Sequence, residues 1–216
     1  MLYPNPLLII GGWIAICIAF SILSRKIFPN QKELSRKIIH IGIGPIILLA
    51  WWFQIPSSIA ISCSAFITSV LIINYRYRFI PEVEDIQRQS YGTIAYGVSI
   101  TLLLILLWSS DPSAVSAGIL VMAFADGLAG LIGKKIKSPN WKVLGQTKSI
   151  AGTIVMALVT ATILVLVGNI STLTITPLNI LSITSIAVIL EQISPFGIDN
   201  ITVPIAVAYA WGWIIQ

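Results

Sequence analysis

Residues 114–132 read AVSAGILVMAFADGLAGLI, a nearly uninterrupted apolar stretch with Asp126 as its one ionisable side chain. About 20 such residues in a helix span the hydrocarbon core of a bilayer. Similar stretches run over residues 7–23, 38–53, 57–73, 93–108, 150–167, 178–190 and 201–215. Because the last two are the least certain, the pattern predicts seven or eight membrane spans.

The composition supports a membrane protein. Of the 216 residues, 56% are hydrophobic and only 10% are charged, whereas soluble domains are about 25% charged. The apolar stretches are too long for strands and show no alternation with period two, which excludes an outer-membrane barrel. We therefore expect an all-α fold: a polytopic transmembrane helical bundle that forms a single integral membrane domain over residues 1–216.

The basic residues predict the orientation. All 13 Lys and Arg residues fall in the first, third and fifth gaps between apolar stretches. By the positive-inside rule these gaps are cytoplasmic, and the N-terminus is outside. The net charge of +5 is thus explained by topology. No aromatic platform is interleaved with the basic residues, so we expect no nucleic-acid partner.

Asp126 is the first candidate for a functional residue, because an ionisable group at that depth costs several kcal/mol unless it is paired or hydrated. Gly127, Gly130 and Gly133 around it would let another backbone approach closely. His40 lies one helical turn after Arg36, on the same helix face. Two roles for His40 stay open at this point: a catalytic residue, or a side chain that hydrogen-bonds a neighbouring carbonyl while Arg36 extends toward the interface.

The fifth gap is a candidate phosphate site. It begins with Gly133, Lys134 and Lys135 and ends with Lys148 and Ser149, directly before an apolar stretch. Lysines and hydroxyls at a helix N-terminus can hold phosphate, because the exposed N–H groups and the helix dipole favour anions. The spacing does not match a Walker A loop, and a charged loop that flanks the membrane is the alternative interpretation.

The seventh gap is acidic among basic ones. Glu191 and Asp199 flank a turn that contains Pro195 and Gly197, and two carboxylates so placed can converge on Mg²⁺. Phosphate-binding cations, metal-binding carboxylates and a buried acid would then lie on one membrane face. That combination fits phosphoryl transfer to or from a lipid.

These motifs together resemble a known family, the phytol kinase branch of the polyprenol kinases. In chain order they are Arg36-Lys37-x-x-His40, Arg88-x-Ser90-Tyr91-Gly92, Ala125-Asp126-Gly127-x-Ala129-x-x-x-Gly133-Lys134, Lys148-Ser149-x-x-Gly152-Thr153, Glu191 and Asp199-Asn200-Ile201-Thr202-Val203-Pro204. The resemblance implies a membrane kinase that transfers the terminal phosphate of CTP, or a related nucleoside triphosphate, to a prenyl alcohol. Phytol is the expected alcohol and phytyl phosphate the expected product. The family includes dolichol kinase and is related to CDP-diacylglycerol synthases.

The resemblance also implies individual positions of the nucleotide region, and we infer their roles. Its nucleotide-binding and phosphate-binding positions are Gly127, Lys134, Lys135, Lys148 and Ser149, to which we add Arg88 and Asn200. The expected metal ligands for Mg²⁺ are Glu191, Asp199 and Asp126. The expected catalytic residues are Asp126, His40 and Arg36, with Asp126 as a base, as an orienting group or as a metal ligand. Relatives often carry a glutamate where this chain has Ala151, so no acidic role is expected there.

The expected setting is a multi-pass membrane protein whose active site lies on the cytoplasmic side. The chain carries no N-terminal transit extension, which favours the cell or thylakoid membrane of a bacterium or cyanobacterium. The expected partners are the lipid membrane, the prenyl alcohol and the nucleotide, and a homodimer is left open. Two alternatives remain open: a lipid cytidylyltransferase of the CDP-diacylglycerol synthase type, and a small ion or solute transporter.

Overall fold

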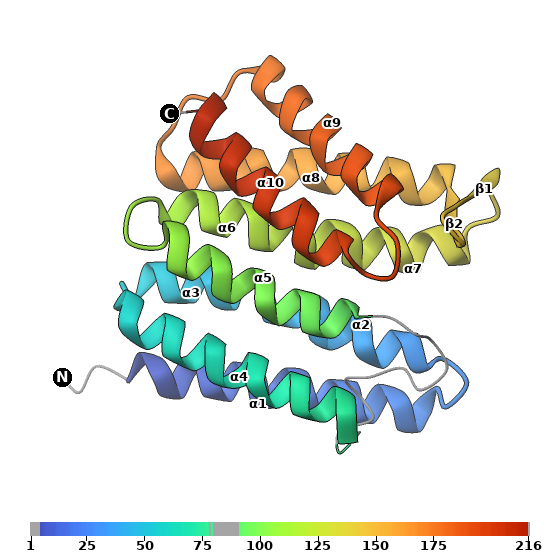
Figure 1. Ribbon diagram of the computed structural model, residues 1–216, viewed down its shortest axis with the longest axis horizontal. Helices are drawn as coiled ribbons and strands as arrows, with labels where there is room; N and C mark the ends of the chain where they lie inside the picture. Colours follow the sequence, from blue (N-terminus) through green and yellow to red (C-terminus); the bar gives the residue numbers. More distant parts are fainter. Residues whose placement is uncertain (1–4, 78, 80–90, 216) are drawn as a thin grey trace.

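The computed structural model describes residues 5–77, 79 and 91–215, and most of them are helical. In chain order the elements are α1 (Pro6–Ile27), α2 (Lys32–Ile43), α3 (Ile46–Trp52), α4 (Ser57–Tyr77), α5 (Gly92–Leu107), α6 (Pro112–Leu120), η1 (Val121–Asp126), α7 (Gly127–Lys135), β1 (Asn140–Val143), β2 (Gln146–Ser149), α8 (Ile150–Ser171), α9 (Pro177–Ile193) and α10 (Asp199–Ile214). The helices lie side by side, and the chain runs back and forth between two ends of the bundle (Figure 1).

Five helical segments of the described chain are long and apolar enough to cross a membrane. They are Pro6–Ile27, Glu33–Trp52, Ser57–Tyr77, Pro112–Lys135 and Ile150–Ser171, and Gly92–Leu107 and Pro177–Ile193 are shorter apolar helices. The structure therefore confirms a nearly all-α fold with five candidate membrane-spanning helices among the described residues. The count of seven or eight spans and the external N-terminus stay predictions.

Proline and capping residues explain where several helices begin. Pro6, Pro112 and Pro177 each occupy the first turn of their helix, where a missing N–H leaves no hydrogen bond unmade. The residue before each one, such as Asp111, accepts a backbone N–H with its side chain. Pro45 separates α2 from α3, so the apolar stretch predicted at residues 38–53 forms two helices.

The most buried segment is the one that contains Asp126. Here α6, the π-helical turn η1 and α7 follow one another without a break, and Val115, Val121 and Met122 are completely buried. Gly118 lies against α10, where a Cβ would come within 2.4 Å of the Pro204 carbonyl oxygen. A π-helical turn is rare and often marks a functional site.

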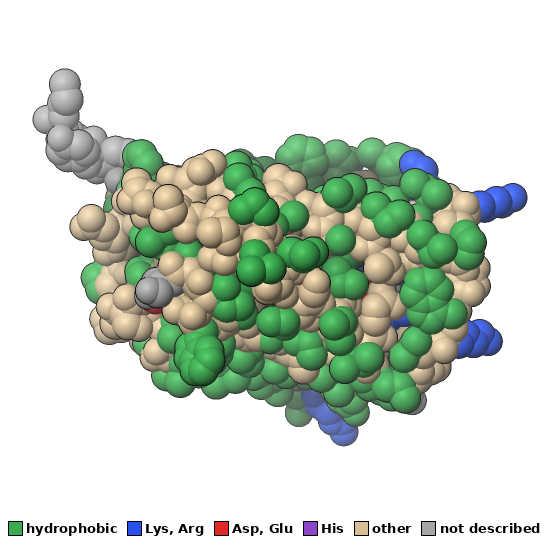
Figure 2. Space-filling view, turned by 90° about the horizontal axis from the view of Figure 1, so that it is seen from above, with side chains coloured by type: hydrophobic (Ala, Val, Ile, Leu, Met, Phe, Trp, Pro, Cys, Tyr) green, Lys and Arg blue, Asp and Glu red, His purple; other side chains and the backbone are tan. Residues whose placement is uncertain are grey.

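The fifth gap contains a β-hairpin, which the all-α prediction did not include. Strands β1 and β2 pair antiparallel, with Trp141 opposite Lys148. The two linking residues, Leu144 and Gly145, have φ values of 47° and 80°, the positive values that a tight two-residue hairpin turn requires. The hairpin lies at one end of the bundle (Figure 1). Lys and Arg side chains project from that same end, while apolar side chains cover the length of the molecule (Figure 2).

Candidate active site

A cavity of about 400 Å³, lined by many charged side chains, lies beside the hairpin. Its walls come from the start of α2, from Asp126 and α7, from the hairpin and the start of α8, and from the α9–α10 turn. Among the residues predicted as functional, those that line it are Arg36, Asp126, Lys134, Lys148, Ser149, Glu191, Asp199 and Asn200. The fold thus gathers motifs that are far apart in sequence into one site.

Three carboxylates meet in this cavity, each from a different helical element. Asp126 ends η1, Glu191 lies near the end of α9, and Asp199 begins α10. One oxygen from each lies within 4.8 Å of the others. Carboxylate oxygens are the ligands that Mg²⁺ prefers. These are the three predicted metal ligands, and their arrangement fits the ion, although the metal itself stays a prediction.

Asp126 is held by two side chains of α2. Lys37 Nζ donates to Asp126 Oδ2 over 2.8 Å and to the Asp126 backbone oxygen over 3.2 Å. His40 Nε2 lies 3.3 Å from the same Oδ2. Lys37 is 5% exposed and His40 8% exposed. The carboxylate is therefore neutralised and oriented from one side of the cavity.

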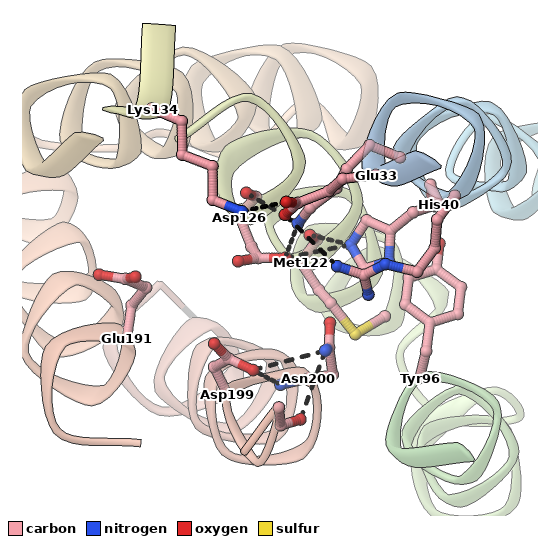
Figure 3. A network of polar contacts seen from close by, with 12 residues as sticks. Glu33, His40, Tyr96, Met122, Asp126, Lys134, Glu191, Asp199 and Asn200 are labelled. Carbon is pink, nitrogen blue, oxygen red and sulfur yellow. Dashed lines mark hydrogen bonds and ion pairs between the residues drawn. The ribbon is translucent and has the colours of Figure 1, made fainter. Parts of the chain in front are cut away.

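His40 is itself fixed by its surroundings (Figure 3). Its Nε2 lies 3.0 Å from the Met122 carbonyl oxygen, and because a carbonyl can only accept, this nitrogen must carry the proton. The Tyr96 hydroxyl donates to the His40 backbone oxygen over 2.8 Å, and the Tyr96 ring packs against the imidazole in a tilted arrangement, with ring centroids 4.3 Å apart. His40 thus hydrogen-bonds a neighbouring carbonyl, which was one of the two roles expected from the sequence. It also contacts the Asp126 carboxylate.

Glu191 has a corresponding set of donors on the other side of the cavity. Lys148 bonds the Glu191 carboxylate through Oε1 and donates to its backbone oxygen over 2.6 Å. Gln192 donates to Glu191 Oε2 over 2.8 Å and to Thr153 Oγ1 over 2.9 Å. Lys148 lies on β2, so the hairpin places this ammonium group beside the carboxylate.

Asp199 differs from the other two carboxylates. Its Oδ1 accepts from the backbone N–H of Asn200 over 3.0 Å and faces the Asn200 amide at 3.4 Å. Among the described residues no Lys or Arg lies within ion-pair distance of Asp199. Asn200 also donates to the Gly197 carbonyl, while its own Oδ1 is buried and has no hydrogen-bond partner in the described part of the chain. Asp199 is thus the carboxylate most available to a cation.

The start of α8 packs tightly on α7 beside these groups. Ser149 caps α8, because its Oγ accepts from Gly152 N over 3.2 Å, and the same Oγ donates to the Gly133 carbonyl over 3.2 Å. A Cβ at Gly133 would lie 2.9 Å from Ser149 Oγ. The glycine spacing of α7 therefore lets α8 bring Ser149 and Lys148 close to Asp126.

Not every predicted residue reaches the cavity. Arg36 and Lys134 line its rim, where both pair with Glu33. Lys135 is exposed and is absent from the described cavity lining.

Gly127 packs against the Ile41 side chain, where it allows α2 to approach η1. Arg88 lies outside the described residues. Lys37 was not among the predicted site residues, although it precedes His40 by three positions and so shares its helix face.

The fold and the site define a class of protein, a helical bundle with candidate membrane spans and a cavity lined by carboxylates and lysines at one end. Comparison with known proteins adds the family. The chain is 36% identical over 214 aligned residues to the phytol kinase of Synechocystis sp., an alignment that covers 92% of this chain and 91% of that protein. The chain belongs to the phytol kinase branch of the polyprenol kinase family, as the motifs predicted.

Chloroplast relatives are more distant. Phytol kinase 1 of Arabidopsis thaliana is 27% identical over 68% of this chain and 52% of its own length. A probable phytol kinase 2 of Oryza sativa is 26% identical over 59% of this chain and 45% of its own length. The aligned region thus spans about half of these plant proteins. No family model matches the chain, and no solved structure matches it.

Proposed function

We propose that this protein phosphorylates a prenyl alcohol dissolved in the membrane, phytol or a close analogue, with the terminal phosphate of CTP. The observation that carries the proposal is the meeting of three carboxylates and two buried lysines in one cavity at the end of an apolar bundle. Membership of the phytol kinase family supports the alcohol as acceptor. CTP is proposed as donor from the motif resemblance.

Cations of the chain would hold the triphosphate. Lys37 and Lys148 are buried inside the cavity, while Arg36 and Lys134 lie at its rim. Ser149 and the first N–H groups of α8 add neutral donors and a helix N-terminus, which attracts anions. Phosphoryl transfer asks mainly for positioning and charge neutralisation, and this set supplies both.

The carboxylates would hold Mg²⁺. Asp126, Glu191 and Asp199 are the proposed ligands, and when bound the ion supplies charge neutralisation for the transferred phosphate. His40 keeps Asp126 in place by donating to its carboxylate, which makes His40 a positioning residue in this proposal. The hydroxyl of the alcohol would approach Asp126 from the membrane-embedded part of the bundle.

The proposed orientation places the cavity on the cytoplasmic side. The basic residues gather at the end of the bundle that carries the cavity, and cytoplasmic loops are rich in Lys and Arg. The N-terminus would then be external, and the cell or thylakoid membrane would be the site of action.

A membrane assay tests the function. Membranes that contain the protein should convert phytol and CTP to phytyl phosphate, and Asp126→Asn should lower the rate at least about a hundredfold, a loss of about 2.7 kcal/mol of transition-state stabilisation. Parallel reactions with UTP and ATP, and with farnesol and geranylgeraniol, would rank the substrates. Wild-type turnover by Asp126→Asn would remove this residue from the mechanism.

The same assay separates kinase activity from cytidylyl transfer. A kinase releases the nucleoside diphosphate, whereas a cytidylyltransferase acting on a lipid phosphate releases pyrophosphate. Detection of pyrophosphate with phytyl phosphate as substrate, and no diphosphate with phytol, would contradict the proposal.

A further inference from the structure

Two of the three carboxylates in the proposed metal site are already paired with lysines. Lys37 Nζ lies 2.8 Å from Asp126 Oδ2, and Lys148 is ion-paired with Glu191 Oε1. Both lysines are at least nine-tenths buried. The ammonium groups therefore hold the same carboxylates that a divalent cation would use.

An ammonium group and a divalent cation at these carboxylates repel each other. A cation that binds Asp126 and Glu191 displaces two buried lysine charges or comes to lie beside them. Either arrangement is unfavourable, because a buried charge without a counter-charge is strongly destabilising. The lysine pairs should thus weaken binding of the bare cation.

A polyphosphate removes this penalty. Its oxygens accept hydrogen bonds from ammonium groups, so the lysine charge stays neutralised when the carboxylates turn to the cation. Each lysine also donates to a backbone oxygen, of Asp126 or of Glu191, which keeps it at the site during such an exchange. Gly130 leaves room for the Lys37 side chain, since a Cβ at Gly130 would lie 3.3 Å from Lys37 Cε.

We propose that Lys37 and Lys148 couple cation binding to polyphosphate binding. In this scheme the two lysines pair with Asp126 and Glu191 until a cation–polyphosphate complex arrives, and they then transfer to the phosphate oxygens. The bare cation binds weakly, and the complex is the species that the site accepts. The inference rests on the proposed function in so far as the cavity is a metal–nucleotide site, and it assigns a role to Lys37.

The proposed coupling predicts opposite changes in cation affinity and polyphosphate affinity, which a purely structural role of the lysines does not predict. Removal of a lysine charge should strengthen binding of the bare cation and weaken binding of the polyphosphate. A lysine that only stabilises the fold would, on removal, weaken both. Linkage also requires that cation and polyphosphate raise each other's affinity by the same factor in the wild type.

The test uses purified full-length protein in detergent, Mn²⁺ as the cation and inorganic tripolyphosphate as the polyphosphate. Mn²⁺ binding is measured by electron paramagnetic resonance without polyphosphate, and tripolyphosphate binding by equilibrium dialysis with and without Mn²⁺. The variants are Lys37→Met and Lys148→Met. Lys142→Met is the matched control, because Lys142 is an exposed lysine of β1 on the same end of the molecule.

We expect Lys37→Met and Lys148→Met to bind Mn²⁺ at least tenfold more tightly than Lys142→Met does. With excess Mn²⁺ they should bind tripolyphosphate at least tenfold more weakly. Mn²⁺ affinity that falls, or stays within twofold of the control, in both variants would overturn the proposal. If the variants fail to fold, the wild-type protein alone still tests the proposal. Equal affinity of the wild type for tripolyphosphate with and without Mn²⁺ would exclude coupling.

The outcome is independent of the proposed enzyme activity. Neither measurement contains an alcohol, a nucleotide base or a phosphoryl transfer step. A protein that shows the coupling but does not phosphorylate phytol would refute the proposed function alone. One that phosphorylates phytol without the coupling would refute only the role given to the lysines.

Discussion

Replacement of Gly133 by alanine should disturb the site through the contact between α7 and α8. A Cβ at this position would lie 2.9 Å from Ser149 Oγ and 3.1 Å from Gly152 Cα. The backbone of α8 cannot rotate away as a side chain could, so either the helices separate or Ser149 leaves its capping position. Both responses move Lys148, the neighbour of Ser149, relative to Asp126.

Opposing contributions set the magnitude. Overpacking of a close contact costs about 1–3 kcal/mol, and loss of the Ser149 cap costs about 1 kcal/mol. Alanine in place of glycine in a helix stabilises the folded protein by roughly 0.5–1 kcal/mol, which offsets part of this loss. We expect a net loss of about 1–3 kcal/mol in the free energy of unfolding. Turnover should fall at least tenfold, since a displacement of about 1 Å can lower a rate about a hundredfold.

Gly12→Ala is the matched control for this prediction. Gly12 lies within α1 and a Cβ there would meet nothing within 4 Å, so alanine should leave stability unchanged or slightly raised. Thermal unfolding in detergent and phytol phosphorylation would be measured for both variants. Equal stability and turnover in Gly133→Ala and Gly12→Ala would refute the idea that close approach of α7 and α8 positions the site.

Two further substitutions each remove one hydrogen-bonding side-chain group. His40→Phe keeps an aromatic ring but removes the N–H donor to Met122 and Asp126. It should lower turnover at least tenfold and the free energy of unfolding by about 1–3 kcal/mol. Unchanged turnover in a membrane assay would show that His40 does not position Asp126. Ser149→Ala should lower the free energy of unfolding by about 1 kcal/mol through loss of the α8 cap, as measured by thermal unfolding, while a melting temperature equal to that of the wild type would contradict the capping role.

The membrane bundle could be predicted because hydrophobic length is a local property of the sequence. The hairpin could not, because strands as short as Asn140–Val143 and Gln146–Ser149 contain no apolar alternation that spans several residues. The break between α2 and α3 was signalled by Pro45, but the apolar pattern continues across it. Local signals of turns were thus weaker than the hydropathy that surrounds them.

The candidate site shows a similar division. Asp126, Glu191 and Asp199 could be selected from sequence because acidic residues are rare next to apolar spans, and the fold brings them together. The sequence did not show which of Lys134 and Lys135 faces the cavity. Adjacent residues on a helix point in directions about 100° apart, so the answer depends on how the helix is rotated in the fold. Only the tertiary structure shows that Lys134 lines the cavity. The pairing of Lys37 with Asp126 likewise depends on how α2 packs against η1.

The most buried charged groups of the site come from residues 37, 126, 148, 191 and 199, which span most of the chain. A ligand that bridges them links α2, near the start of the chain, to α10, the last helix. Binding to the folded protein alone adds about 2.7 kcal/mol of stability at a ligand concentration of 100 times Kd. The melting temperature of the purified protein would therefore rank candidate nucleotides and metals before any alcohol substrate has been found.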